Sequence, residues 1–258
     1  MTSGDRPGDH GPSAPAQAVA ARIPAPHGAS ESAGVKLAAP ILVAGFGLVF
    51  VCLFVFGTLA EGVRSQEVFA LDQFATPFLH RFTSPALDAV METATFIGSN
   101  VVVVPAFVVA FTALLVVRRR REAVLLAMAL GGSLVLNGVM KPLFHRPRPQ
   151  LPWAHVLPDY SFPSGHSMNS MAFFVALAVV AWLAWGRRAG VAAMMAAIGV
   201  SLLIGVSRIY LGYHYLTDVV GGFSAALLWL AVTAGAIAAG DRARSRWWRR
   251  DGRGVRPE

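Results

Sequence analysis

The chain has 258 residues, of which 55% are apolar and only 14% are charged, and its formal net charge is +8. Ordinary soluble domains carry about 25% charged residues, so this composition excludes a water-soluble globular domain and indicates that lipid is the main solvent. The basic residues lie at the ends of apolar runs and accompany no recognition motif. We therefore expect no nucleic-acid partner, and nothing in the sequence identifies a protein partner.

The N-terminal residues 1–36 are rich in Ala, Pro, Gly and Ser, which predicts a disordered cytoplasmic tail. Six uncharged apolar runs follow, each close to or above the roughly 18–20 residues that a helix needs to cross a bilayer. Helices are predicted because lipid cannot satisfy open backbone groups and because the runs are too long for barrel strands. The first run is favoured as a membrane anchor over a signal peptide, because it exceeds a signal core of about 7–15 residues and begins far from the N-terminus. The runs are Leu37–Ala60, Thr93–Val117, Ala123–Met140, Ser161–Gly186, Ala189–Ser207 and Val219–Gly240.

Residues 61–92, between the first two runs, show a different pattern. Apolar residues recur there at helical spacing among charged ones, and the pattern resumes after Pro85. This predicts one or two amphipathic helices along the membrane surface, either as a scaffold packed on the bundle or as a wall of a lipid entry gap. The first apolar set is Val68, Leu71, Phe74, Phe78 and Phe82.

The predicted fold is therefore all-α: an integral membrane bundle of six transmembrane helices over residues 37–240, followed by a basic cytoplasmic tail over 241–258. The distribution of basic residues predicts its orientation. Sixteen of the 22 Lys and Arg residues fall on one side, in the two tails, in Arg118–Arg121 and at Arg187–Arg188. Cytoplasmic segments carry such an excess, so both termini are predicted inside. The six outward basic residues are Arg64, Arg81, Lys141, Arg146, Arg148 and Arg208.

Three of the outward basic residues are predicted to bind a phosphoryl group. Lys141, Arg148 and Arg208 follow helix ends that the topology places at one depth, near the lipid headgroups. The ammonium group of the lysine and the two planar guanidinium groups of the arginines suit phosphate oxygens. Ser164 is a good N-cap for the fourth helix, and Gly165 leaves backbone N–H groups open to an anion at the positive end of that helix.

Two histidines and one carboxylate are expected at the same depth. His214 and Asp218 are four residues apart, so on a helix Asp218 can hold one ring nitrogen of His214 and leave the other free to attack. His166, on another helix, is available as a general acid for the leaving oxygen. These three residues are also a possible zinc or iron ligand set. The three nearby cations oppose a metal dication, so we expect no metal and no other cofactor.

These residues carry a family resemblance. The sequence resembles the tripartite signature of the type-2 phosphatidic acid phosphatase superfamily, with no departure at any specified position. The resemblance implies that His214 becomes a phosphohistidine, Asp218 orients it, and His166 protonates the leaving group without a metal. The haloperoxidase branch of the family is not expected, because its members are soluble. The matching segments are Lys141-(six residues)-Arg148-Pro149, Pro163-Ser164-Gly165-His166, and Ser207-Arg208-(five residues)-His214-(three residues)-Asp218.

The predicted function is thus a lipid phosphatase in a bacterial cell membrane, with its active site facing outward. Candidate substrates are polyprenyl pyrophosphate, phosphatidylglycerophosphate and phosphatidic acid. Arg146 and His145 are candidate ligands of a second phosphate, or equally contacts to neighbouring headgroups. A phosphotransferase that uses the same phosphohistidine and a non-catalytic phospholipid-binding or transport protein are the alternatives.

Overall fold

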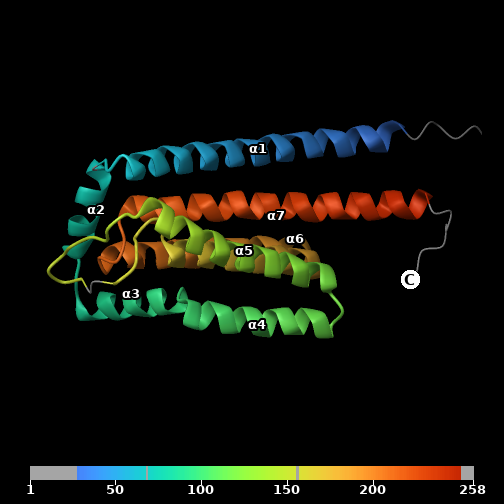
Figure 1. Cartoon of the computed structure of the whole chain (residues 1–258). Coiled ribbons are helices and arrows are strands. Elements are labelled where there is room, and N and C mark those ends of the chain that lie inside the picture. The colour runs from blue at the N-terminus through green and yellow to red at the C-terminus, as the bar shows by residue number, and fades with distance from the viewer. Residues whose placement is uncertain (1–27, 68, 155–156, 251–258) are drawn as a thin grey trace, which may run out of the picture. The chain divides into compact units, whose positions relative to one another are not determined.

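The computed structural model describes residues 28–67, 69–154 and 157–250, with side chains from residue 43 to 247 in those ranges. All regular structure there is helical. The chain forms two compact units, Met1–Gly45 and Phe46–Glu258, and the second unit contains every element of the site described below. The helices are α1 Gly28–Arg64, α2 Ala70–His80, α3 Pro85–Ile97, α4 Asn100–Val116, α5 Arg120–Phe144, α6 Gly165–Tyr210 and α7 Leu216–Arg250 (Figure 1).

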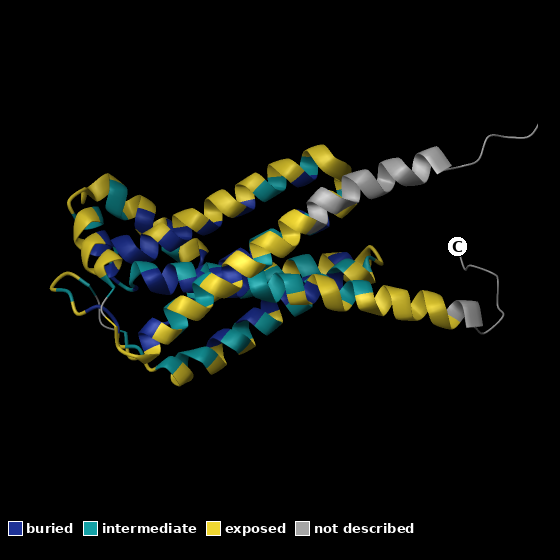
Figure 2. Cartoon of the chain, turned by 90° about the horizontal axis from the view of Figure 1, so that it is seen from above, coloured by how far each residue is buried: buried dark blue, intermediate teal, exposed yellow. Residues whose placement is uncertain are grey.

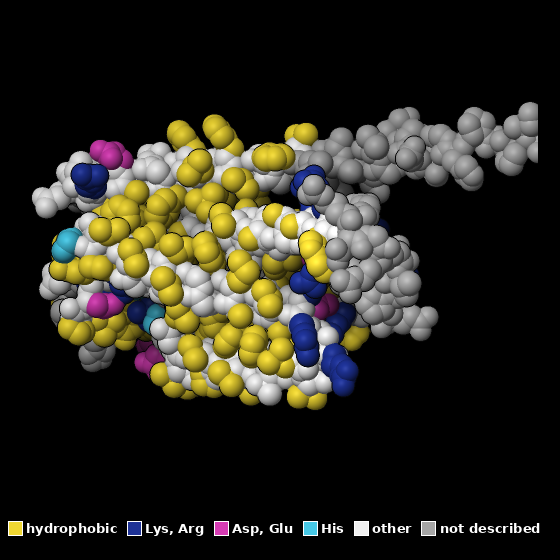
Figure 3. Space-filling view, turned by 45° about the vertical axis from the view of Figure 1, so that its right-hand side comes forward, with side chains coloured by type: hydrophobic (Ala, Val, Ile, Leu, Met, Phe, Trp, Pro, Cys, Tyr) yellow, Lys and Arg dark blue, Asp and Glu magenta, His cyan; other side chains and the backbone are white. Residues whose placement is uncertain are grey.

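Four of the described helices are long and apolar enough to cross a membrane: α1 from Val43, α5, α6 and α7. The pair α3 and α4 passes the same test as one span that bends by 48° at Gly98 and Ser99, which gives up to five candidate spans by length and composition. Large apolar side chains remain exposed along these helices. Figure 2 colours many helical residues as exposed, and Figure 3 shows hydrophobic side chains spread over the face in view. Lipid as solvent accounts for this exposure, because it removes the need to bury apolar surface.

Helix α6 is 46 residues long and is interrupted at Gly186, whose φ of 81° and ψ of −172° suit only glycine. Phe174 and Val200 line the same pocket, although a straight helix would hold them about 39 Å apart at 1.5 Å per residue. The two halves of α6 therefore fold back on each other at Gly186. This agrees with the two separate runs that the sequence predicted on either side of Arg187 and Arg188.

Polar side chains link three helices inside the bundle. Ser133 of α5 donates to Oδ1 of Asn169 on α6 at 2.8 Å, and Asn169 donates to Oδ1 of Asn100 on α4 at 3.2 Å. Such hydrogen bonds contribute about 0.6 kcal/mol each within a bilayer. They also fix the register between apolar helices, because dispersion alone would leave that register loosely defined. A core cluster from the same helices packs beside them.

Two contacts position the end of the bundle at which α2 lies (Figure 1). Helix α2 packs through Ala75 on Ile209 and Val219, at the end of α6 and the start of α7. The start of α6 approaches α7 so closely that a Cβ at Gly222 would lie 2.7 Å from the Ser164 carbonyl oxygen. Glycine at 222 is therefore required for the two helix starts to meet.

The structure corrects several predicted boundaries. Helix α1 begins at Gly28, inside the predicted tail 1–36, and residues 1–27 lie outside the described part of the chain. Helix α7 continues to Arg250, so the predicted tail 241–258 starts as helix, and 251–258 are not described. The predicted second span, from Thr93, begins earlier as α3.

The segment predicted as amphipathic forms α2 and the start of α3. The apolar stripe of α2 faces outward, with Leu71 and Phe74 each more than 60% exposed, while Asp72, Ala75 and Thr76 are buried. The polar side of α2 is thus the one packed on the bundle, and an outward apolar stripe suits contact with lipid. Val68 lies outside the described residues, and the placement of α2 along a membrane surface stays a prediction.

Candidate active site

His214 and Asp218 form a buried pair at the turn between α6 and α7. Nδ1 of His214 lies 3.3 Å from Oδ2 of Asp218, which also accepts from the N–H of Tyr215 at 2.9 Å. On the other side of the ring, Nε2 lies 3.1 Å from Nη1 of Arg148. A guanidinium can only donate and a carboxylate only accept, so the hydrogen belongs on Nδ1 and Nε2 keeps its lone pair. The nitrogen predicted to attack is therefore the one that faces the cations.

The surroundings keep this imidazole neutral. Burial, followed by the positive charges of Arg208, Arg148 and Lys141, holds the pKa of His214 well below its ordinary value. A neutral ring at neutral pH has a lone pair available for nucleophilic attack. The arrangement thus supplies the protonation state that the sequence prediction requires.

Lys141 and Arg148, two of the predicted phosphate ligands, meet on one carboxylate. Asp159 accepts from Nη2 and Nε of Arg148 at 2.6 and 3.0 Å through Oδ1, and its Oδ2 pairs with Nζ of Lys141. Burial alone would raise the pKa of Asp159, but the hydrogen bonds and charges of Lys141 and Arg148 hold it below its usual value. These two cations are therefore spaced to share one oxyanion. Asp159 belongs to none of the three motif segments, so its place in the site was not predicted.

Arg208 and His166 complete the cluster. Arg208 is 4% exposed, donates from Nη1 to Thr95 at 2.6 Å and stacks over the Tyr213 ring, while its buried Nε has no hydrogen-bond partner among the described residues. His166 lies within electrostatic range of Arg208, Lys141, Arg148 and His214. Five residues, from α5, its following loop, both ends of α6 and the α6–α7 turn, thus lie near one another. Their common depth in a membrane stays a prediction.

The start of α6 differs in one detail from the prediction. Ser164 caps the helix, accepting from the Ser167 N–H at 3.4 Å, as its type suggested. Its own N–H, however, already donates to the Asp218 carbonyl at 3.0 Å, so it is not open to an anion. In the described part of the chain, the N–H groups of Gly165 and His166 are the ones left for an anion, because the first turn of a helix offers them no carbonyl partner.

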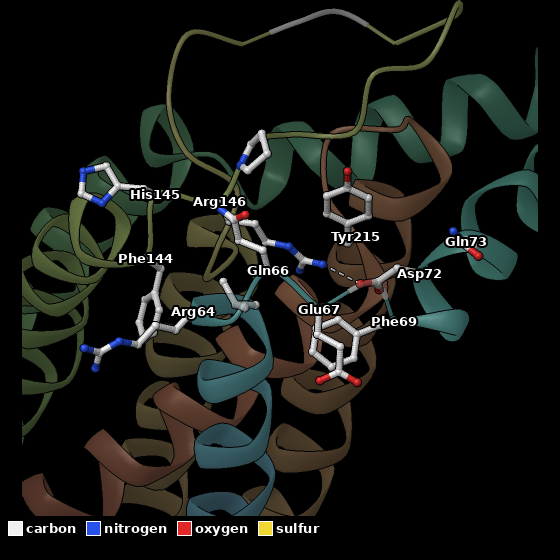
Figure 4. A pocket seen from close by; sticks show the side chains of 12 residues that line it. Arg64, Gln66, Glu67, Phe69, Asp72, Gln73, Phe144, His145, Arg146 and Tyr215 are labelled. Carbon is white, nitrogen blue, oxygen red and sulfur yellow. Dashed lines mark hydrogen bonds and ion pairs between the residues drawn. The ribbon is translucent and has the colours of Figure 1, made fainter.

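Arg146 and His145, predicted as ligands of a second phosphate, line a separate cavity of about 500 Å³ (Figure 4). Both terminal nitrogens of Arg146 are engaged within the protein: Nη1 with Asp218 at 2.5 Å and Nη2 with Asp72 at 2.7 Å. His145 packs edge-on against the Tyr160 ring. The contacts of Arg146 favour an internal role, and a second phosphate at this pair stays a prediction.

The described residues contain no group of three or more His, Cys, Asp or Glu side chains arranged to hold a metal ion. His214 and Asp218 are instead surrounded by guanidinium and ammonium groups, which attract an anion. A reaction without a metal stays a prediction, which the chelator experiment below tests.

The comparisons with known proteins all indicate the same family. Residues 122–239 match the family model described as PAP2 superfamily. The chain is 31% identical to phosphatidylglycerophosphatase B of Bacillus subtilis strain 168 over 173 residues, 66% of this chain and 85% of that protein. It is 30% identical to YbjG of Escherichia coli strain K12, named as a candidate undecaprenyl-diphosphatase, over 52% of this chain and 67% of that protein.

A solved structure is also similar. It is the crystal structure of a transmembrane PAP2-type phosphatidylglycerolphosphate phosphatase from Bacillus subtilis. The two superpose with a TM-score of 0.67 at 28% sequence identity, over 72% of this chain and 94% of the other. The family-model match, residues 122–239, includes every residue of the site from Lys141 to Asp218.

Proposed function

The chain belongs to the PAP2 superfamily and is a membrane lipid phosphatase, and we propose that it hydrolyses its substrate through a phosphohistidine at His214, on the outer membrane face. The observation that carries this proposal is the fixed tautomer of His214, whose Nε2 lone pair faces Arg148 while Asp218 holds Nδ1. A nucleophile with its lone pair directed at an anion-binding cluster suits attack on a phosphorus atom.

The first chemical step forms the phosphoenzyme. Nε2 of His214 attacks phosphorus, the bond from phosphorus to the leaving oxygen breaks, and that oxygen takes a proton from His166. Lys141, Arg148 and Arg208 balance the charge of the equatorial oxygens, together with the amides at the start of α6. In the second step a water, deprotonated by His166, attacks the phosphohistidine and releases inorganic phosphate, which returns both histidines to their starting state.

The orientation and the six spans are part of the same proposal. With the two halves of α6 counted separately and α3 with α4 counted once, the chain crosses the membrane six times. Arginines in the turn between α4 and α5, and in the turn at the break of α6, then lie on the side opposite the site. An excess of basic residues marks the cytoplasmic side. Arg119, which donates to the Leu183 carbonyl near the α6 break, supports placing these turns at the same end.

We propose a phosphorylated lipid as substrate, and the names of two relatives correspond to two of the three candidates. One relative is named for phosphatidylglycerophosphate and another for undecaprenyl diphosphate. Each of these two lipids carries a phosphate at the depth of the headgroups and an apolar tail. Such a molecule suits a polar site at the end of an apolar helix bundle. Phosphatidic acid remains the third candidate.

The purified protein in detergent is expected to release phosphate from at least one of these three lipids, at a rate unchanged by excess chelator. The expectation follows because the cations that face the phosphoryl group are side chains, which a chelator cannot remove. Phosphate release is measured on each lipid with and without chelator. Release that stops with chelator would contradict the metal-free mechanism, and release only after adding a second lipid acceptor would favour a phosphotransferase.

Replacing Asp159 with asparagine is expected to make the enzyme more sensitive to phosphate and vanadate, by about tenfold in inhibition constant. In the wild type the Asp159 carboxylate occupies Lys141 and Arg148, so an incoming oxyanion must displace it. Because its pKa is depressed, the carboxylate keeps this contact at neutral pH and loses it only as the pH falls below that lowered value. Weaker inhibition of Asp159→Asn than of wild type would show instead that Asp159 orders the cations.

A further inference from the structure

A chain of buried charges leads from Asp218 away from His214 to helix α2. Oδ1 of Asp218 accepts from Nη1 of Arg146 at 2.5 Å, and Nη2 of Arg146 donates to Oδ2 of Asp72 at 2.7 Å. Asp72 also accepts from the backbone N–H and the hydroxyl of Thr217 at 2.9 and 2.6 Å. The side chains of Arg146, Asp72 and Asp218 are 11%, 4% and 0% exposed, so water screens these charges poorly.

We infer that Asp72 and Arg146 are positioning residues of the reaction, which set the charge and orientation of Asp218 and, through it, of the nucleophile His214. The inference rests on the proposed function. It extends that function to two residues outside the described chemical steps, one of them on α2. Both residues connect to the His214 ring through Asp218, which lies at Nδ1.

The charge balance explains why two carboxylates share one guanidinium. If Arg146 paired with Asp218 alone, it would neutralise the charge that must face the Nδ1–H of His214. Asp72 draws part of the guanidinium charge to itself, so the three groups together keep one negative charge. That charge stabilises the positive imidazole ring that develops as Nε2 forms its bond to phosphorus.

The geometry holds Arg146 in one place. Its guanidinium stacks over the Tyr215 ring at 4.2 Å and lies 5.7 Å from the Phe69 ring centroid. Burial alone would lower the pKa of Arg146, but the charges and hydrogen bonds of Asp218 and Asp72 raise it, so the group stays charged. Figure 4 shows Arg146 reaching across the cavity from the loop after α5 to Asp72 at the start of α2.

A purely structural role is the competing explanation, because the ion pair also fastens α2 to the bundle. The two roles differ in the pH dependence of activity, since the His214–Asp218 pair titrates as a unit and loses activity when it binds a proton. Removing the positive charge of Arg146 should make protonation of this pair easier. Removing the negative charge of Asp72 should make it harder. The charged or titratable groups around the chain are Tyr215 and His214 at Asp218, Arg64, Glu67 and His145 around the cavity, and Arg148, Arg208, Lys141, Asp159 and His166 around His214.

The test compares Asp72→Asn and Arg146→Gln in the full-length protein, on the lipid that the wild type hydrolyses. Both variants are expected to lower kcat by about 10- to 100-fold, the usual cost of losing a partner that orients an active group, with KM within about threefold. The acid limb of kcat/KM should move to higher pH in Arg146→Gln and to lower pH in Asp72→Asn. The matched control is Asp88→Asn on α3, which removes a carboxylate that accepts from Tyr210 at 2.5 Å and should leave kcat and the pH profile unchanged.

The double variant guards against misfolding as an explanation. Asp72→Asn placed in the Arg146→Gln background removes an uncompensated buried carboxylate, so it should recover part of the activity lost in Arg146→Gln. Losses without opposite pH shifts, or an Asp72→Asn variant that behaves like Asp88→Asn, would overturn the inference. Failure of the proposed function is distinguishable, because then the wild type itself releases no phosphate or His214→Ala retains the activity.

Discussion

Replacing His214 with alanine is expected to reduce phosphate release by about 10⁴-fold or more, because the variant has no atom in the place of Nε2 to form the phosphoenzyme. The cations around the site are untouched, so substrate binding should remain. The comparison of kcat with KM on the same lipid measures this separation. A second readout is the acid-labile phosphohistidine, which should be trapped in rapidly quenched wild-type enzyme and be missing from the variant.

The control for this variant is His80→Ala. His80 ends α2 and stacks its ring on Trp153, with ring centroids 3.9 Å apart, and no step of the proposed reaction involves it. Wild-type turnover in His80→Ala together with loss in His214→Ala would assign the effect to one ring. Full activity in His214→Ala would eliminate the phosphohistidine mechanism.

Replacing His166 with alanine is expected to lower kcat by about 10²- to 10⁴-fold on a lipid phosphate monoester, the usual contribution of a general acid. The size of the loss should depend on the leaving group. A lipid alkoxide needs a proton as it departs, whereas an aryl phosphate leaves readily as a phenolate. The variant should therefore lose much less activity on p-nitrophenyl phosphate than on the lipid.

This dependence separates proton donation from mere shaping of the site. His166 makes no hydrogen bond to another side chain among the described residues, so its replacement should disturb the fold little. Rates are measured for wild type and His166→Ala on a series of aryl phosphates of decreasing leaving-group acidity. An equal loss on every member of the series would argue that His166 only positions the phosphoryl group.

The composition and the motifs already determine much of this protein. Long uncharged runs can be stable in lipid only as helices, so the helical class follows from residue type alone. The sequence predicts that four residues lie together, because consecutive spans alternate in direction and every second connection between spans then lies on the same side of the membrane. These residues are Lys141, Arg148, Arg208 and His214. The i, i+4 spacing of His214 and Asp218 likewise needs only local geometry.

Other features depend on packing between distant segments. Asp72 meets Thr217, 145 residues away, and Asp159 meets Lys141 across the α5–α6 loop. Nothing in the local sequence distinguishes these carboxylates from solvated ones, because their partners are set by how α2 docks on the bundle and by the path of the loop between α5 and α6. The side of α2 that packs on the bundle could not be predicted for a related reason, since helical spacing identifies an apolar stripe but not what covers it.

What the sequence determined by itself is thus the helical membrane class, since this follows from residue type and from the length of the apolar runs. The depth of the site in the membrane and the residues that attack, donate and hold an anion stay predictions. Only the tertiary structure decided which groups are partnered. It assigned the Ser164 N–H to the Asp218 carbonyl and Arg146 to two carboxylates, and it directed the His214 lone pair at Arg148. Hydrogen bonds are short and directional, so their partners are fixed only when the helices are in place.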